Sequence, residues 1–209
     1  MKIAEKLILA VTAIFALIGG VYFYQINSDV NYSNLVQVYE QEREIKPFTL
    51  IDETDQPFTN EELKDKWSLV FLGYLSCPDI CPMTMAKLSG LLPKLNEVSE
   101  QPVQVLLVSV DPQRDTVEKR AQYVNYFHKD IKGLGAQHKD LYPFVTNLGL
   151  MYSIPSSDQE NYYVDHSASV VLINPHGRIS AIFKPEISVG KVPTIDTQLL
   201  LSDFSSLIY

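Results

Sequence analysis

A strand-to-helix junction that carries both cysteines of the chain constrains the fold most strongly. Residues 71–83 read FLGYLSCPDICPM, in which an apolar run leads directly into a turn with Cys77 and Cys81. Pro82 then stands where the first turn of a helix tolerates proline. The apolar residues that follow recur at spacings of three and four, which is typical of an amphipathic helix. The segment therefore predicts a buried strand that delivers two thiols to the N-terminus of a helix.

Predicted strands and helices alternate on both sides of this junction. We expect strands at 48–52, 67–72, 103–110, 169–173 and 178–183, and helices at 59–66, 82–98, 115–127, 140–152 and 194–207. Pro93 is expected to kink or shorten the second of these helices. This order of elements indicates an α/β fold. The dithiol at a strand-to-helix junction makes the predicted fold thioredoxin-like, a sheet with flanking helices.

The N-terminus predicts a membrane anchor. Lys2 and Lys6 precede an apolar stretch of about 18 residues, near the lower limit for a helix that crosses the hydrocarbon core. The lysines favour a cytoplasmic N-terminus and an exported remainder. A cleaved signal peptide is the alternative, but the stretch ends in GGVYFY rather than in a small-x-small cleavage site.

Three parts of the chain follow from this interpretation. We expect an uncleaved signal-anchor at 1–25, which forms one transmembrane helix, a periplasmic tether at 26–44, and a folded domain at 45–209. The expected location is the bacterial inner membrane, crossed once, with the C-terminal domain in the periplasm.

Composition excludes two classes of protein. The formal net charge of -8 leaves no basic patch to displace counterions from phosphates, so we expect no nucleic-acid partner. Two cysteines in 209 residues are too few for a disulfide scaffold. A close pair of cysteines is instead typical of redox chemistry or of metal binding.

Cys77 and Cys81 suit either a redox-active disulfide or a shared soft metal ion. A helix N-terminus favours the thiolate form, and residues four apart lie on one face of a helix. Thioredoxin-type dithiols have two intervening residues, so the three found here weaken a simple redox interpretation. A purely stabilising disulfide is less favoured, because closing so small a loop removes little entropy from the unfolded chain.

A third ligand could come from one of four histidines. His128 and His138 stand among charged residues, and His176 lies in a predicted hairpin turn, so we expect these three to face solvent. His166 differs because it enters a buried strand. In a thioredoxin-like fold this segment lies across from the dithiol helix. The pattern alone fits a metal ligand and a histidine satisfied within the core equally well.

Four motifs follow one another along the domain: PFTLIDETDQPFT, KWSLVFLGYLSCPDICP, VSVDPQRDT and YYVDHSASVVLINPHGR. In this order they resemble the Sco/SenC family, copper-binding proteins of cytochrome oxidase assembly with a thioredoxin-like fold. The resemblance covers nearly the whole domain, and a single N-terminal anchor is also typical of the family. It implies that Cys77, Cys81 and His166 bind one copper ion per domain, as Cu(I), Cu(II) or both.

Three aspartates lie within these motifs. Asp79 and Asp165 match family positions, and the resemblance implies that they tune the metal charge or partner docking; the alternative is that each carboxylate caps a loop amide. Asp111, in VDPQRDT, is expected to fix the loop after its strand rather than to bind metal.

The resemblance implies a membrane-tethered copper metallochaperone that delivers copper to the CuA site of cytochrome c oxidase. The copper-accepting subunit of the oxidase is then the expected partner, with other periplasmic copper chaperones or thiol reductants as further candidates. Two thiolates and an imidazole suit Cu(I) and can also hold Cu(II).

Three other interpretations use the same residues. A thiol:disulfide reductase would use Cys77 and Cys81 as a redox-active disulfide to reduce the cysteines of the CuA site or of other exported proteins, and it would not need His166. An open zinc site is chemically possible. Peroxidase action is less favoured, because a partner thiol so close favours dithiol chemistry.

Overall fold

A computed structural model describes residues 3–26, 32–154 and 162–208 of the chain. The chain divides into two compact units, Met1–Tyr32 and Ser33–Tyr209. The first unit contains helix α1 (Ile3–Ile26). Among the described residues, no helix is long and apolar enough to cross a lipid bilayer. The structure therefore does not support the transmembrane helix expected at 1–25, and residues 27–31 of the expected tether lie outside the described part.

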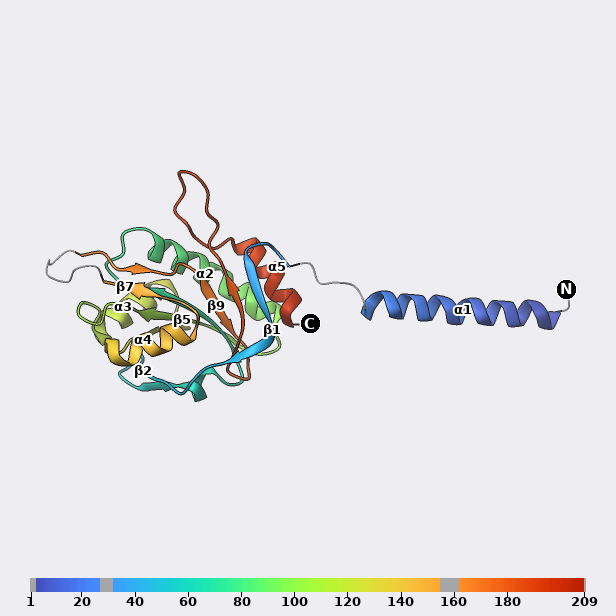
Figure 1. Cartoon of the computed structure of the whole chain (residues 1–209), viewed down its shortest axis with the longest axis horizontal. Coiled ribbons are helices and arrows are strands. Elements are labelled where there is room, and N and C mark those ends of the chain that lie inside the picture. The colour runs from blue at the N-terminus through green and yellow to red at the C-terminus, as the bar shows by residue number, and fades with distance from the viewer. Residues whose placement is uncertain (1–2, 27–31, 155–161, 209) are drawn as a thin grey trace. The chain divides into compact units, whose positions relative to one another are not determined.

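The second unit is built on a six-stranded sheet (Figure 1). The strand order is β1–β10–β9–β4–β5–β6. Its strands are β1 (Val36–Glu44), β4 (Trp67–Gly73), β5 (Val103–Ser109), β6 (Ile131–Leu134), β9 (Val170–Ile173) and β10 (Arg178–Phe183). Strands β4, β5 and β6 run parallel, and the other neighbours pair antiparallel. This mixed α/β sheet confirms the predicted fold class.

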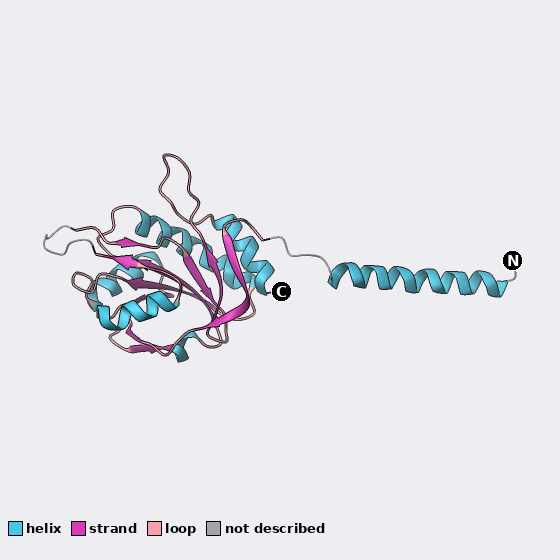
Figure 2. Cartoon of the chain, viewed as in Figure 1, coloured by secondary structure: helices cyan, strands magenta, loops and turns pink. Residues whose placement is uncertain are grey.

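Helices cover this sheet (Figure 2). They are α2 (Ile80–Val98), α3 (Val117–Phe127), α4 (His138–Asn147) and α5 (Thr197–Ile208). The crossovers through α2 and α3 step in the same direction along the sheet, and the right-handed rule places both helices on one face. Every residue of β4 and β5 is buried. These strands are covered on both faces, which explains their unbroken apolar sequences.

The folded unit begins earlier than the sequence predicts. Residues Val36–Glu44, expected in the tether, form the edge strand β1, which pairs with β10. Before it, the backbone N–H and the hydroxyl of Ser33 donate to the carboxylate of Asp203 in α5 at 2.8 and 2.6 Å. The expected boundary at residue 45 is therefore wrong. The segment was predicted to be a linker because it is rich in charged residues, but charge is also typical of an exposed edge strand.

Short elements differ from the prediction in type or length. The helix expected at 59–66 is a single 3-10 turn, η1 (Asn60–Leu63), after the hairpin of β2 (Thr49–Ile51) and β3 (Pro57–Thr59). Helix α4 ends before Gly149, whose φ of 81° is left-handed and favours glycine. Helix α2 continues past Pro93 to Val98, so the proline does not shorten it. Strands β7 (Tyr152–Ser153) and β8 (Asp165–His166) form a separate two-residue ladder that was not predicted.

Candidate metal centre

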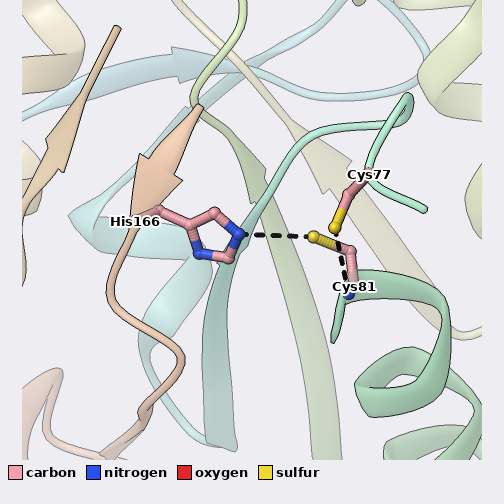
Figure 3. Close-up of side chains that lie close together, drawn as sticks. All are labelled: Cys77, Cys81 and His166. Carbon is pink, nitrogen blue, oxygen red and sulfur yellow. Dashed lines mark hydrogen bonds between the residues drawn. The ribbon is translucent and has the colours of Figure 1, made fainter. Parts of the chain in front are cut away.

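Cys77, Cys81 and His166 converge at the end of β4 (Figure 3). Their sulfur and nitrogen atoms all lie within 4.8 Å of one another. The sulfur of Cys81 is 3.4 Å from Nε2 of His166, and the backbone N–H of Cys81 donates to the sulfur of Cys77 at 3.5 Å. Both cysteines are free thiols. The structure thus brings together the three residues that the sequence singled out.

The cysteines are held by the strand that precedes them and the helix that follows. The backbone N–H of Cys77 donates to the carbonyl of Tyr74 at 3.2 Å. Cys81 is fully buried in the first turn of α2. Gly73 leaves room for its sulfur, because a Cβ at this position would lie 3.3 Å from Cys81 Sγ and 2.9 Å from a methyl group of Leu107.

The orientation of the His166 imidazole is fixed by its neighbours. Nδ1 lies 3.1 Å from the carbonyl oxygen of Ser167. A carbonyl only accepts, so Nδ1 is the donor in this contact, and the contact orients the ring with Nε2 facing Cys81. The rings of Phe71 and Tyr74 stand edge-on to the imidazole, with centroid separations of 5.9 and 6.0 Å.

The two thiols differ in acidity. A hydrogen bond from the Cys81 thiol lowers the pKa of Cys77 to about 3, assisted by His166 and by backbone N–H groups and opposed by burial. The same hydrogen bond, together with burial, raises the pKa of Cys81. The arrangement therefore favours the thiolate at Cys77 and the protonated thiol at Cys81. A metal that binds both sulfurs must displace that proton.

The other histidines lie apart from this cluster. His128 is partly buried, although exposure was expected, and accepts a hydrogen bond from the backbone N–H of Asp130 at 3.2 Å. His176 is exposed in its turn. His138 is partly buried, with Nδ1 2.9 Å from the hydroxyl of Tyr152. Its expected exposure is therefore only partial, because α4 packs it against that ring.

The three aspartates also have distinct positions. Asp79 and Asp165 are exposed, and neither belongs to the cluster of converging ligands. Asp79 occupies the N-cap of α2 but makes no side-chain hydrogen bond to that helix. Asp111 is fully buried, and its carbonyl accepts from the backbone N–H groups of Arg114 and Asp115. It therefore fixes the loop after β5, as the sequence predicted.

Sequence reasoning missed the residues that surround the ligands. Tyr74 is buried beside both Cys77 and His166, and burial raises the pKa of its phenol to about 12, with the nearby thiols adding to the shift. Asp115 is buried and accepts from the backbone N–H of Leu75 at 3.0 Å. Both residues lie inside two of the four sequence motifs, but nothing in a linear pattern shows what they contact.

The chain matches the SCO1/SenC family over residues 36–195. It belongs to this family. The match begins at β1, which agrees with the boundary of the folded unit. The resemblance read from the four sequence motifs is confirmed.

Sco relatives occur in bacteria and in mitochondria. A protein of Stutzerimonas stutzeri whose name describes copper binding is 31% identical over 166 residues, 79% of this chain and 81% of that protein. The mitochondrial SCO2 homolog of Mus musculus is 36% identical over 132 residues, 62% of this chain and 52% of that protein. The chain thus spans about half the length of the mouse relative.

Solved Sco structures share the fold. ScoI of Arabidopsis thaliana with copper bound superposes with a TM-score of 0.67 at 28% identity, over 78% of this chain and 96% of that one. ScoI of Bradyrhizobium japonicum with copper bound gives 0.64 at 25% identity, over 78% and 99%. The thioredoxin-like Sco architecture predicted from the sequence is therefore confirmed.

Proposed function

We propose that this Sco protein binds one copper ion through Cys77, Cys81 and His166. The observation that carries the proposal is the convergence of two sulfurs and one imidazole nitrogen within 4.8 Å. Thiolates select soft Cu(I), and an imidazole donor extends the site to Cu(II). The copper-bound structures of the Arabidopsis and Bradyrhizobium relatives support the choice of copper over zinc.

We further propose that the protein is a metallochaperone that passes this copper to the CuA site of cytochrome c oxidase. Cys77 and His166 are only partly buried, so the thiols of an acceptor can reach the ion from that side. Cys81 is fully buried, so acceptor thiols reach it less readily than they reach Cys77. Membership of the Sco family supports the oxidase subunit as the acceptor.

A thiol:disulfide reductase is the second candidate function. Two free thiols lie close together, and Cys77 has a lowered pKa. Thiolate character is what attack on a disulfide requires. This reaction needs no imidazole ligand, so His166 separates the two functions.

His166→Ala should abolish tight Cu(II) binding and oxidase maturation while the two cysteines still exchange with disulfides. Maturation is measured by the absorption of the CuA centre in membranes of a strain that carries the variant, and exchange by reduction of a model disulfide in vitro. His176→Ala is the matched control, because this histidine is exposed and lies outside the cluster. Normal oxidase maturation with His166→Ala would refute the chaperone function and leave the reductase.

We also propose that the domain acts on the periplasmic side of the bacterial inner membrane, held there by the N-terminal segment. The support is the sequence pattern of two lysines before an apolar stretch, which is independent of the structure. Cell fractionation with a fusion reporter tests it, and recovery of the chain from the cytosol would refute it.

A further inference from the structure

The loop between β5 and α3 contacts both segments that carry the ligands. Its motif VDPQRDT supplies two buried carboxylates. Asp115 accepts from the backbone N–H of Leu75 at 3.0 Å, two residues before Cys77. Asp111 accepts from the hydroxyl of Tyr162 at 2.6 Å, four residues before His166. One loop thus holds the cysteine segment through one carboxylate and the histidine segment through the other.

Arg114 of the same loop lies between the two segments. Its Nε donates to the second carboxylate oxygen of Asp111. The carbon at the centre of its guanidinium is 3.6 Å from the ring centroid of Tyr162 and 5.6 Å from that of Tyr74. Tyr74 in turn stands edge-on to the imidazole of His166. Contacts therefore run without interruption from Tyr162 through Arg114 and Tyr74 to the metal ligand.

The contacts of Arg114 with Asp111 and Tyr162 should be costly to break. Asp111 is fully buried, and the Arg114 side chain is 19% exposed. Removing one partner of a buried ion pair leaves the other charged and unpaired, which is costly. A guanidinium over an aromatic face adds cation–π attraction, which strengthens when the pair is shielded from water.

The position of His166 depends on such contacts because its strand is so short. Strand β8 has two residues and pairs with β7, outside the six-stranded sheet that positions the cysteines. The ladder fixes His166 relative to Tyr152. The Asp111–Arg114–Tyr162 cluster joins its segment to the loop that also holds the cysteine segment.

We propose that Arg114 and Tyr162 are positioning residues that hold His166 at the two sulfurs and thereby stabilise bound Cu(II) more than bound Cu(I). The inference rests on the proposed copper site. Two thiolates satisfy Cu(I), whereas Cu(II) prefers nitrogen donors in a tetragonal arrangement. Displacing the imidazole should therefore weaken Cu(II) binding first.

Two variants test the cluster with little change of shape. Tyr162→Phe removes the hydroxyl that donates to Asp111 and keeps the ring over Arg114. Arg114→Gln removes the cation. Arg178→Gln is the matched control, because it removes an arginine that pairs with Glu44 between the strands β10 and β1. Circular dichroism and unfolding curves show whether each variant folds, and the milder tyrosine variant still decides if Arg114→Gln does not.

The measurements compare the two copper ions in each reduced full-length variant. Cu(I) affinity is measured by competition with bicinchoninate, and Cu(II) affinity by the thiolate-to-copper charge-transfer band. Arg114→Gln should lower Cu(II) affinity by about 10- to 100-fold, the usual cost of losing a residue that orients a ligand. Nitrogen coupling in the electron paramagnetic resonance spectrum should weaken with it. Tyr162→Phe should do the same to a smaller extent, while Cu(I) affinity in both stays at the wild-type value.

The outcomes distinguish failure of the positioning role from failure of the proposed copper site. Equal losses of both ions, or unchanged Cu(II) affinity and nitrogen coupling in both variants, would overturn the positioning role while leaving the copper site intact. A wild-type protein that binds neither ion would instead refute the proposed function, on which this inference rests.

Discussion

Gly73 shows how tightly the candidate ligands are built into the core. A methyl group at this position would lie 2.9 Å from Leu107 and 3.3 Å from the sulfur of Cys81. Both distances require neighbours to move, and one of these neighbours is a proposed copper ligand. The packing around Gly73 therefore links stability to metal binding.

Gly73→Ala should destabilise the domain by about 1–3 kcal/mol, the usual cost of overpacking a core, and should also weaken copper binding. Urea unfolding of the metal-free protein measures the first effect. Gly90→Ala is the control, because Gly90 lies in α2 with nothing within 4 Å of an added Cβ. There alanine should stabilise by up to about 1 kcal/mol. A Gly73 variant as stable as the wild type would show that the strand end adjusts freely.

Cys77 should react as a thiolate at pH values at which an ordinary cysteine is still protonated. The hydrogen bond from Cys81 holds the pKa of Cys77 well below its ordinary value. Its rate of alkylation by iodoacetamide in the reduced, metal-free protein should therefore change little between pH 5 and pH 9. An ordinary thiol, with a pKa of about 8.5, would react faster with each step up in pH across most of this range. A rate that rises with a midpoint near pH 8.5 would contradict the proton sharing between the two sulfurs. Buried Cys81 should stay unmodified.

At the scale of elements, the strands covered on both faces were the easiest to predict. Every residue of β4 and β5 is buried, so an unbroken apolar run marks each strand. No residue of edge strand β1 is fully buried and the strand carries charges, so its sequence pattern resembles that of a linker. The ladder of β7 and β8 is two residues long, too short for any periodicity.

The site was predictable to the extent that its residues are close in sequence. The spacing of Cys77 and Cys81 placed both thiols at one helix start. His166 comes from a distant segment, and only the family motifs distinguished it from a core histidine. Arg114 and Tyr162 were missed because their contact joins segments that are far apart in the sequence.

Strand β1 should be required for a stable domain. A chain that starts at residue 33 retains β1 and the hydrogen bonds of Ser33 to Asp203. A chain that starts at residue 45 uncovers β10, including Ile182 and Phe183. The shorter chain should be less stable by more than about 2 kcal/mol, the order expected when buried apolar side chains are exposed. Chemical denaturation compares the two truncated chains. Equal midpoints would show that the stable domain begins at residue 45 and does not need β1.

At the scale of the whole molecule, the proposed copper site joins three distant parts of the chain. The β4–α2 junction provides the thiols, β8 provides the imidazole, and the β5–α3 loop contacts both segments. A metal that binds only the folded arrangement stabilises the fold by mass action. Copper binding and the integrity of the domain are therefore expected to be coupled.

The copper content of the reduced protein, after Cu(II) loading and desalting, tests the central claim most directly. The wild-type chain should retain one equivalent with a thiolate-to-copper absorption band, also when zinc is offered in competition. Cys77→Ala, Cys81→Ala and His166→Ala should each lose the ion, and His176→Ala should keep it. Unchanged copper content in the three ligand variants, or preferential retention of zinc by the wild type, would contradict the assignment of this site to copper.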